Sequence, residues 1–260
     1  MSESRISLTI DGAIGQLRIA RPEKLNALDA AMVDDLAARC REIEHHDGIR
    51  VVVLSGAGKA FSAGGDIEAW SAASPERFGR HWIRDGHAAF DALARLRQPV
   101  IAVLDGHALG GGLELAACAD IRIAEEQVKI GQPESGLGIV PGWSGTQRAV
   151  RRFGAQTVRR MALFGEVLAA EEALKLGIVD QVVPAGTGAA AAAELARAVL
   201  RRGSRATELV KMTINAAEGE ERERVLEAIS GALAAGTDEL AEGLAAFREG
   251  RKPDFGKGDT

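Results

Sequence analysis

Two glutamates in this sequence have surroundings that suit acid–base chemistry. Glu114 follows Gly110-Gly-Gly112 at the start of an apolar helical stretch, and Glu134 follows Pro133 in a loop 134 − 114 = 20 positions later. A carboxylate among apolar neighbours loses solvation, which raises its pKa and suits it to proton transfer. Two such carboxylates form a general acid/base pair. The sequence alone leaves a helix-capping or surface role open for either one.

Two glycine turns accompany these glutamates in the sequence. Ala63-Gly64-Gly65 follows the apolar run at 51–54, and Gly110-Gly-Gly112 follows the run at 100–104. Glycine lets a ligand approach the backbone closely, and Gly111 lies at a helix N-terminus, where free N–H groups and the helix dipole favour negative charge. Two such N–H groups can form an oxyanion hole. The glycines alone are also compatible with plain strand-to-helix turns.

Other chemical motifs are incomplete. Gly56-Ala-Gly-Lys59 lacks the first glycine and the Ser or Thr of a phosphate-binding loop, and Gly142-Trp-Ser-Gly145 lacks the spacing of a nucleophile elbow. The absence of a GxGxxG fingerprint weighs against a nicotinamide-dependent dehydrogenase. The histidines and cysteines show no metal-ligand spacing, so we expect no metal site.

The composition is that of a soluble globular protein. Of the 260 residues 46% are hydrophobic, and 32 basic against 37 acidic residues give a formal net charge of −5, which weighs against a nucleic-acid partner. No apolar run reaches the ~18 residues of a membrane span, and the polar N-terminus has no apolar leader. Because Cys40 and Cys118 lie in apolar segments, we expect reduced core thiols in a cytoplasmic protein.

Strand and helix patterns alternate through the first part of the chain. Apolar residues alternating around Asp11-Gly12 predict a hairpin over residues 6–19, and Asp29 is the expected N-cap of the next helix. Apolar runs and helical spacing predict the other elements: strands at 51–54, 100–104 and 120–124, and helices over about 75–96 and from 112. Repetition of strand, glycine-rich loop and helix predicts an α/β fold with functional loops at the strand ends.

The pattern changes at about residue 189. Strand signals end there, and helical stretches follow near 189–202, 205–217, 220–235 and 238–249. A segment of this size buries its own core poorly, so we expect it to pack on the main domain or on another subunit. We therefore predict a core domain with the ligand site at residues 1–195 and a helical C-terminal oligomerisation segment at residues 196–260.

Several motifs together resemble the enoyl-CoA hydratase/isomerase (crotonase) family over nearly the whole chain. They are Arg21-Pro-Glu-Lys-Leu-Asn-Ala-Leu28, Ala60-Phe-Ser-Ala-Gly-Gly-Asp-Ile67, Gly106-His-Ala-Leu-Gly-Gly-Gly-Leu-Glu114, Gly131-Gln-Pro-Glu134, Gly136-Leu-Gly-Ile-Val-Pro-Gly142 and Glu242-Gly-Leu-Ala-Ala-Phe-Arg-Glu-Gly-Arg-Lys-Pro253. The resemblance implies an α/β spiral of ββα units with a C-terminal helical trimerisation region, assembled as a homotrimer or a dimer of trimers. It implies an acyl-CoA thioester as ligand and no cofactor, since coenzyme A is part of the substrate.

The resemblance also implies roles for residues at matching positions. The Gly65 and Gly111 N–H groups would hold the thioester oxygen. The adenine and pantetheine would run along Leu25, Ala63, Asp66 and Ile67. Phe247 would meet the coenzyme A of a neighbouring subunit, whereas the basic residue expected three positions later is Gly250 here. Since the family's hydratases carry both glutamates, Glu114 would assist attack of water on C3 and Glu134 would deliver a proton to C2.

Trp143 and Ser144 depart from the small residues usual in the family's hydratases. A bulky Trp143 in the acyl pocket would exclude long chains or admit an unusual acyl group, and the alternative is that it points into the core. We expect residues 68–86, with Trp70, Phe78 and Trp82, to form a mobile wall of that pocket.

These residues favour hydration of a 2-enoyl-CoA to the 3-hydroxyacyl-CoA. The nearest alternative is an isomerase, or another acyl-CoA reaction on the same scaffold, since isomerisation needs only one carboxylate. The alternative from a different class is a non-catalytic acyl-CoA binder, which would have no use for paired acids in a buried site.

Overall fold

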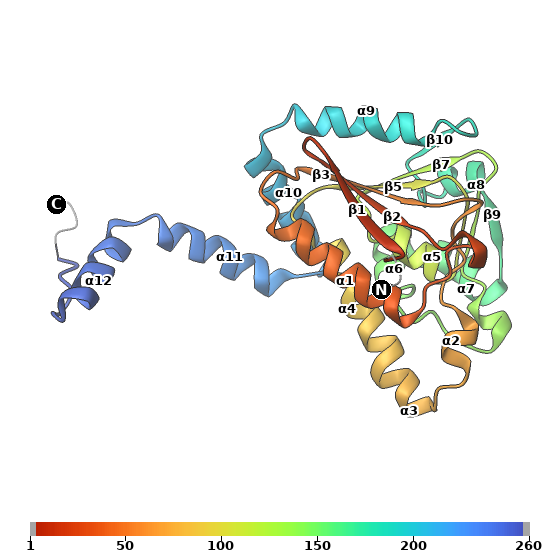
Figure 1. Cartoon of the computed structure of the whole chain (residues 1–260), viewed down its shortest axis with the longest axis horizontal. Coiled ribbons are helices and arrows are strands. Elements are labelled where there is room, and N and C mark those ends of the chain that lie inside the picture. Colours follow the sequence, from red (N-terminus) through yellow and green to blue (C-terminus); the bar gives the residue numbers. More distant parts are fainter. Residues whose placement is uncertain (1–3, 257–260) are drawn as a thin grey trace. The chain divides into compact units, whose positions relative to one another are not determined.

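Two sheets and their surrounding helices form the first of two compact units, residues 1–211, and the second unit is residues 212–260. The computed structural model describes residues 4–256 (Figure 1). The larger sheet contains, in spatial order, β1 (Ile6–Asp11), β2 (Ile14–Ile19), β3 (Val51–Gly56), β5 (Val100–Leu104), β7 (Ile121–Glu125) and β10 (Gln181–Val183). The smaller sheet contains β4 (Ala60–Ser62), β6 (His107–Leu109), β8 (Lys129–Gly131) and β9 (Val167–Ala169).

Consecutive strands alternate between the two sheets. The pairs β3–β4, β5–β6 and β7–β8 each place their first strand in the larger sheet and their second in the smaller sheet. The strands β4, β6 and β8 run parallel to one another. Parallel strands end at the same edge, so the loops that carry Gly65, Gly111 and Glu134 all leave the smaller sheet on one side.

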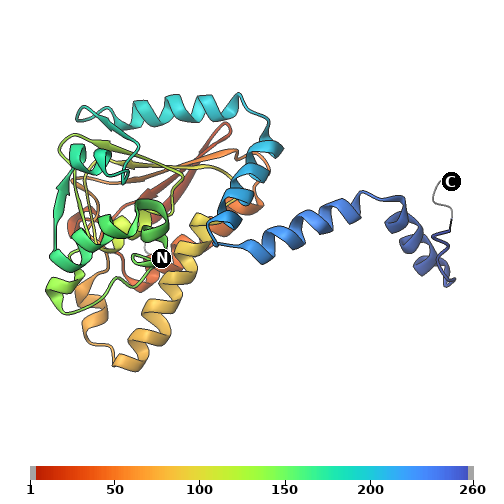
Figure 2. The same ribbon diagram turned by 180° about the vertical axis from the view of Figure 1, so that it is seen from behind.

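Both faces of the larger sheet are buried, as its continuous apolar runs predict. Along β3, Val52 and Leu54 face the main core, whereas Val51 and Val53 face a second core. The second core lies under α9 (Gly188–Leu200), which lies along that face of the sheet in both views (Figure 1, Figure 2). Alternation of side chains along each strand thus supplies both cores.

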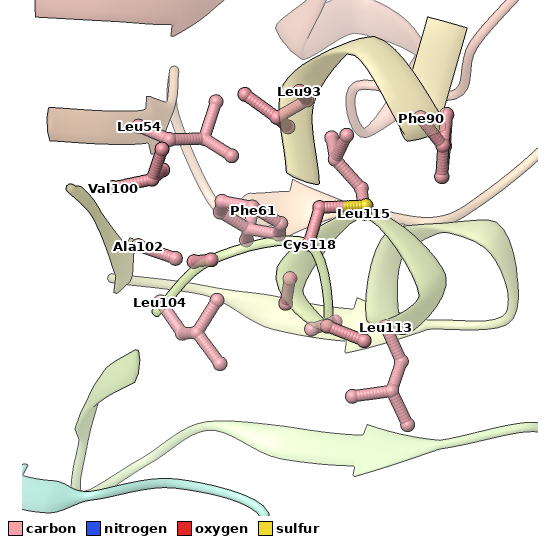
Figure 3. Close-up of a cluster of buried hydrophobic side chains, with 14 of the residues drawn as sticks. Leu54, Phe61, Phe90, Leu93, Val100, Ala102, Leu104, Leu113, Leu115 and Cys118 are labelled. Carbon is pink, nitrogen blue, oxygen red and sulfur yellow. The ribbon is translucent and has the colours of Figure 1, made fainter. Parts of the chain in front are cut away.

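The main core lies between the other face of this sheet and three helices, α1 (Ala30–His45), α4 (Arg84–Ala94) and α5 (Gly111–Ala116). Figure 3 shows Phe61 of β4 beside the strand residues Leu54 and Val100, with Leu115 of α5 and Phe90 of α4 on its other side. The remaining helical elements of this unit are the 3₁₀ turn at Pro22–Lys24, α2 (Ile67–Ser71), α3 (Pro75–Arg77), the π-helical stretch at Phe78–Ile83, the 3₁₀ turn at Glu134–Leu137, α6 (Gln147–Phe153), α7 (Ala155–Phe164) and α8 (Ala170–Lys175).

Most of the predicted elements are confirmed. The hairpin of β1 and β2 turns at Gly12, whose φ of +57° suits glycine, and the Asp29 side chain accepts a hydrogen bond from Met32 N at 3.0 Å as the N-cap of α1. The helix expected over 75–96 is divided into α3, the π-helical stretch and α4. Cys40 and Cys118 are free and buried, as expected of core thiols.

The helices expected after residue 189 are present as α9, α10 (Ser204–Ala217), α11 (Arg222–Ala235) and α12 (Asp238–Glu249). The division between the units falls after Lys211, inside α10, whereas the boundary proposed from the sequence lies inside α9. Lys211 belongs to the first unit, where its Nζ donates to Asp120 Oδ2 at 2.7 Å. Within residues 4–256, no helix has the length and apolar character needed to cross a bilayer.

Candidate active site

The two glycine turns lie against each other. Gly64 has a φ of +98°, and a Cβ added to it would lie 2.9 Å from Gly111 N and 3.0 Å from Leu109 O. Only glycine takes this conformation without strain and leaves room for the second turn. The close approach places Gly65 and Gly111 beside one cavity.

Both predicted oxyanion N–H groups lack an acceptor: within the described part of the chain, neither Gly65 N nor Gly111 N donates a hydrogen bond. Around Gly65, Leu28 N donates to Gly64 O at 2.8 Å and Asp66 N donates to Leu28 O at 2.7 Å. Since N–H groups alternate in direction along an extended segment, the Gly65 N–H points away from Leu28. Gly111 is the first residue of α5, so its N–H has no intrahelical acceptor.

Asn26 fixes the turn that carries Gly65. This side chain is fully buried; its Nδ2 donates to Ala57 O at 2.9 Å and Ala60 O at 2.6 Å, and its Oδ1 accepts from Arg21 N at 2.8 Å. Ser62 Oγ donates to Asn26 O at 2.8 Å and accepts from Gly64 N at 3.1 Å. These bonds connect the loop before α1 to both ends of β4.

Asp66 continues this support. Its side chain is 7% exposed, accepts from Arg21 Nη1 at 2.6 Å and caps α2 by accepting from Glu68 N at 3.1 Å. Burial raises the pKa of Asp66, but the hydrogen bond and charge of Arg21 outweigh it, so the pKa of Asp66 lies below its usual range. The carboxylate predicted along the coenzyme A path is thus engaged within the protein.

Glu114 is held in one orientation at the inner end of the cavity. It lies in the first turns of α5 with 3% of its surface exposed, and its Oε1 accepts from Trp143 N at 2.7 Å and Gly145 N at 2.6 Å. Burial and the charge of Glu134 raise the pKa of Glu114 to about 7, although the backbone hydrogen bonds oppose this. Glu114 therefore exchanges protons near neutral pH.

Glu134 faces the same cavity without any such support. Both carboxylate oxygens are buried and have no hydrogen-bond partner in residues 4–256, and burial raises the pKa of Glu134 above its usual range. Oε1 of Glu134 would lie 3.2 Å from a Cβ added to Gly110, so the glycine run lets this carboxylate approach α5. A buried carboxylate without a partner has its full hydrogen-bonding capacity left for a water or a ligand.

The cavity has a volume of about 100 Å³ and combines these polar groups with an apolar wall. Its wall comes from α2, the 75–86 region and the loop after Glu134: Ile67, Trp70, Phe78, Trp82, Ile83, Pro133, Leu137, Ile139, Val140 and Trp143. A mostly apolar pocket with a few converging polar groups is the usual form of a small-molecule site. The aromatic residues expected in a wall at 68–86 lie here.

Trp143 lies both in the core and in the wall of the cavity, the two positions that the sequence left open. Its side chain is 2% exposed and belongs to the main core, and it also lines the cavity. Its Nε1 donates to Trp82 O at 3.0 Å, and its ring lies 5.0 Å from the rings of both Trp82 and Phe90. Ser144 follows it with a φ of +78°, a strained value for a residue other than glycine.

The other predicted contact residues lie in several places. Ala63 and Ile67 line the cavity, and Leu25 is 51% exposed on the neighbouring loop, where its O accepts from Ala63 N at 3.0 Å. Phe247 lies on α12 in the second unit and is 86% exposed. In residues 4–256, no three His, Cys, Asp or Glu side chains form a group that could hold a metal ion.

Two residues that support the site were not predicted. Asn26 stands in the first matching motif, but only the fold shows that its side chain joins two loops. A Cβ on Gly145 would lie 2.6 Å from Glu114 Oε1 and 2.4 Å from Gln132 Nε2, so the glycine is required for the carboxylate to be held. In the sequence, Gly145 was only the end of a failed nucleophile elbow.

Comparison with known proteins gives likenesses that extend over most of the chain. The family model for enoyl-CoA hydratase/isomerase matches residues 9–258. The chain is 34% identical to the probable enoyl-CoA hydratase echA8 of Mycobacterium tuberculosis, over 98% of this chain and 99% of that protein. It is 37% identical to the short-chain-enoyl-CoA hydratase of Clostridium acetobutylicum, over 83% of this chain and 82% of that protein. The crystal structure of an enoyl-CoA hydratase/carnithine racemase from Magnetospirillum magneticum matches with a TM-score of 0.81 at 33% identity, over 98% of this chain and 96% of that chain.

Proposed function

From the premise that this chain belongs to the enoyl-CoA hydratase/isomerase family, we propose that it adds water to a 2-enoyl-CoA to give the 3-hydroxyacyl-CoA. The observation that carries the proposal is the meeting of two free backbone N–H groups and two buried carboxylates at one small cavity. A reaction that builds negative charge on a carbonyl oxygen and moves two protons uses all four groups.

The two N–H groups hold the thioester carbonyl oxygen in this proposal. As the hydroxyl oxygen bonds to C3, electron density moves through C2 to the carbonyl oxygen and gives an enolate-like charge. Gly65 N and Gly111 N are fixed donors for that charge, and the N-terminus of α5 adds the favourable end of a helix dipole. Each donor of this kind typically contributes ~2.7–4 kcal/mol to lowering a barrier.

The two glutamates divide the proton transfers. Two carboxylates that face one cavity repel each other when both are charged, so one of them holds a proton near neutral pH. In the reacting form the two backbone N–H groups stabilise Glu114 as the carboxylate and the shared proton is on Glu134, so Glu114 takes the proton from the attacking water. Glu134 gives its proton to C2, and proton exchange between the two sites and solvent restores the starting state. Positioned groups of this kind typically contribute ~10²–10⁴-fold in rate each.

Coenzyme A binding and assembly form the second part of the proposal. The adenine and pantetheine run along Leu25, Ala63, Asp66 and Ile67, and Phe247 meets the coenzyme A of a neighbouring subunit. The chain then acts as a homotrimer or a dimer of trimers, and neither metal nor redox cofactor enters the reaction. Exposed apolar side chains in the second unit support an assembly: Leu226, Leu233, Leu240, Leu244, Phe247 and Phe255.

The experiment that tests the reaction follows crotonyl-CoA by the loss of its conjugated-thioester absorbance, without any added cofactor. We expect turnover by the native protein and a loss of ~10²-fold or more in kcat for both Glu114→Gln and Glu134→Gln. Each glutamine keeps the shape of the side chain and removes its proton chemistry. Binding of butyryl-CoA, measured by calorimetry, should persist in both variants.

A matched control separates these roles from loss of charge elsewhere. Glu68→Gln changes an exposed carboxylate that pairs with Lys24 outside the cavity, so it should leave turnover unchanged. Native protein that binds butyryl-CoA but turns over no enoyl-CoA would contradict the hydratase proposal and favour an isomerase or a non-catalytic binder. Full activity in either cavity variant would remove that glutamate from the mechanism.

A further inference from the structure

Two glycines make room for the indole ring of Trp143, and a third lies beside it. A Cβ on Gly86 of α4 would lie 2.0 Å from Trp143 Nε1, and a Cβ on Gly111 would lie 3.0 Å from both Cε3 and Cζ3. A Cβ on Gly65 would lie 3.6 Å from Cη2 of Trp143, an ordinary contact distance, and 2.9 Å from Cζ2 of Trp82. The five-membered part of the ring thus rests on α4, and the six-membered part lies against the two turns whose N–H groups are free.

The ring has no freedom to leave this position. Its Nε1–H donates to Trp82 O at 3.0 Å, and the rings of Trp82 and Phe90 lie 5.0 Å away on tilted planes. The same residue's backbone N donates to Glu114 Oε1 at 2.7 Å, so the backbone that carries the ring is anchored as well. A side chain that is 2% exposed and fixed at both ends is a rigid part of the cavity wall.

We propose that Trp143 closes the acyl end of this cavity and restricts the substrate to short-chain acyl-CoA thioesters of the crotonyl class. The inference rests on the proposed function, because it places the thioester carbonyl at Gly65 and Gly111. An acyl group that starts there meets the edge of the indole at once, within a cavity of about 100 Å³. A longer chain must displace a ring that one hydrogen bond and two aromatic neighbours hold in place.

The test compares crotonyl-, hexenoyl-, octenoyl- and decenoyl-CoA as substrates of the native protein and of Trp143→Leu and Trp143→Phe. A pocket that lacks room for one methylene group discriminates by about 10–200-fold. We therefore expect native kcat/KM for octenoyl-CoA to be at least ~10-fold below that for crotonyl-CoA. Trp143→Leu removes the ring and should reduce the ratio of kcat/KM for crotonyl-CoA to that for octenoyl-CoA by ~10-fold or more. Trp143→Phe keeps most of the wall and should reduce this ratio less.

A binding series keeps this inference separate from the proposed reaction. The saturated butyryl-, hexanoyl-, octanoyl- and decanoyl-CoA undergo no hydration, so calorimetry reports the fit of the acyl chain alone. If no enoyl-CoA is hydrated but the native protein favours butyryl-CoA and Trp143→Leu loses that preference, the reaction is wrong and the inference stands. Thermal unfolding of each variant identifies any that does not fold, and the phenylalanine variant then carries the test.

Three outcomes would overturn the inference. One is native protein that handles decenoyl-CoA and crotonyl-CoA equally well. Another is a chain-length profile that Trp143→Leu leaves unchanged in a folded variant. The third is a preference of the native protein for cinnamoyl-CoA, because that flat aromatic acyl group would show that the aromatic wall accepts a ligand larger than the short chains proposed.

Discussion

Glu114 combines two opposing influences at one carboxylate. Two backbone N–H groups favour its charged form, and burial with the neighbouring Glu134 favours its protonated form. The second influence is stronger, so the pKa of Glu114 rises from 4.5 to about 7. A group of this kind stabilises the folded state while it is protonated and loses that contribution as it becomes charged.

This balance predicts a pH-dependent effect of Glu114→Gln on stability. The folded pKa lies above the unfolded pKa, so the contribution of Glu114 is complete below pH 4.5 and is lost as the pH rises through about 7. Glutamine accepts the same hydrogen bonds and does not titrate. The free energy of unfolding of the variant, relative to native protein, should therefore increase by about 2–3 kcal/mol between about pH 5 and pH 8. Urea denaturation at several pH values measures this, and a difference that is constant with pH would contradict the burial of Glu114.

Gly145→Ala tests how the carboxylate is held. The new Cβ would lie 2.6 Å from Glu114 Oε1 and 2.4 Å from Gln132 Nε2, so the carboxylate or the loop must move. Misplacement of a catalytic group by about 1 Å typically costs ~10²-fold in rate. We expect kcat for crotonyl-CoA to fall by about that factor while butyryl-CoA binding changes little. Gly136→Ala is the matched control, because a Cβ there meets nothing within 4 Å. Equal kcat values for the two variants would contradict this role.

The sequence points to the acid pair and to the two glycine turns because their signals are local. Apolar neighbours mark Glu114, a rigid proline precedes Glu134, and glycine runs mark the two turns, in which the family resemblance singles out Gly65 and Gly111. Asn26 and Gly145 act on groups 31 or more positions away along the chain, and no local pattern reports such a contact. For the same reason the sequence does not decide whether Trp143 faces the core or the cavity. In the fold its side chain belongs to the core and also lines the cavity.

At the scale of elements, the smaller sheet brings the site together. The α/β spiral expected from the family resemblance is confirmed, with the long strands of the larger sheet where their apolar runs predict them. The strands β4, β6 and β8 were not predicted, because three residues are too few to show an alternating pattern. These strands place the loops that carry Gly65, Gly111 and Glu134 at one edge of the sheet. The candidate site is therefore positioned by short strands that only tertiary pairing stabilises.

A helix-scale prediction concerns Gly86 in α4. Alanine is favoured over glycine in a helix by about 1 kcal/mol, but a Cβ at this position would lie 2.0 Å from Trp143 Nε1. Overpacking of a core typically costs ~1–3 kcal/mol, so Gly86→Ala should lower the free energy of unfolding. Gly79→Ala provides the control, since a Cβ there meets nothing within 4 Å and the variant should be as stable as native protein or more stable. Urea denaturation compares the two, and equal stabilities would contradict the tight fit of the indole.

At the scale of the whole molecule, the second unit exposes several large apolar side chains. Leu226 and Leu233 on α11 are 62% and 70% exposed, and Leu244 and Phe247 on α12 are 45% and 86% exposed. Exposed apolar side chains that share a small unit indicate a surface that another protein chain covers. The proposed partner is a second copy of this chain.

The substitution Leu233→Glu tests that proposal. A charge in an apolar interface is desolvated without a partner, so it should weaken self-association by at least ~10-fold. Light scattering after size-exclusion chromatography should give three or six chains for native protein and smaller species for the variant. Lys175→Glu, on α8 in the first unit, is a control of similar chemistry. Native protein that remains a monomer at micromolar concentration would contradict the assembly.

The close fit around Trp143 also couples two positions that lie far apart in the sequence. A tryptophan at position 143 and a side chain at position 86 compete for the same space, because a Cβ on Gly86 would lie 2.0 Å from the indole nitrogen. The two positions are therefore epistatic, and their substitutions are not additive. Gly86→Ala should therefore cost less stability in the Trp143→Leu background than in the native protein. A buried residue of α4 and the wall of the cavity thus depend on each other.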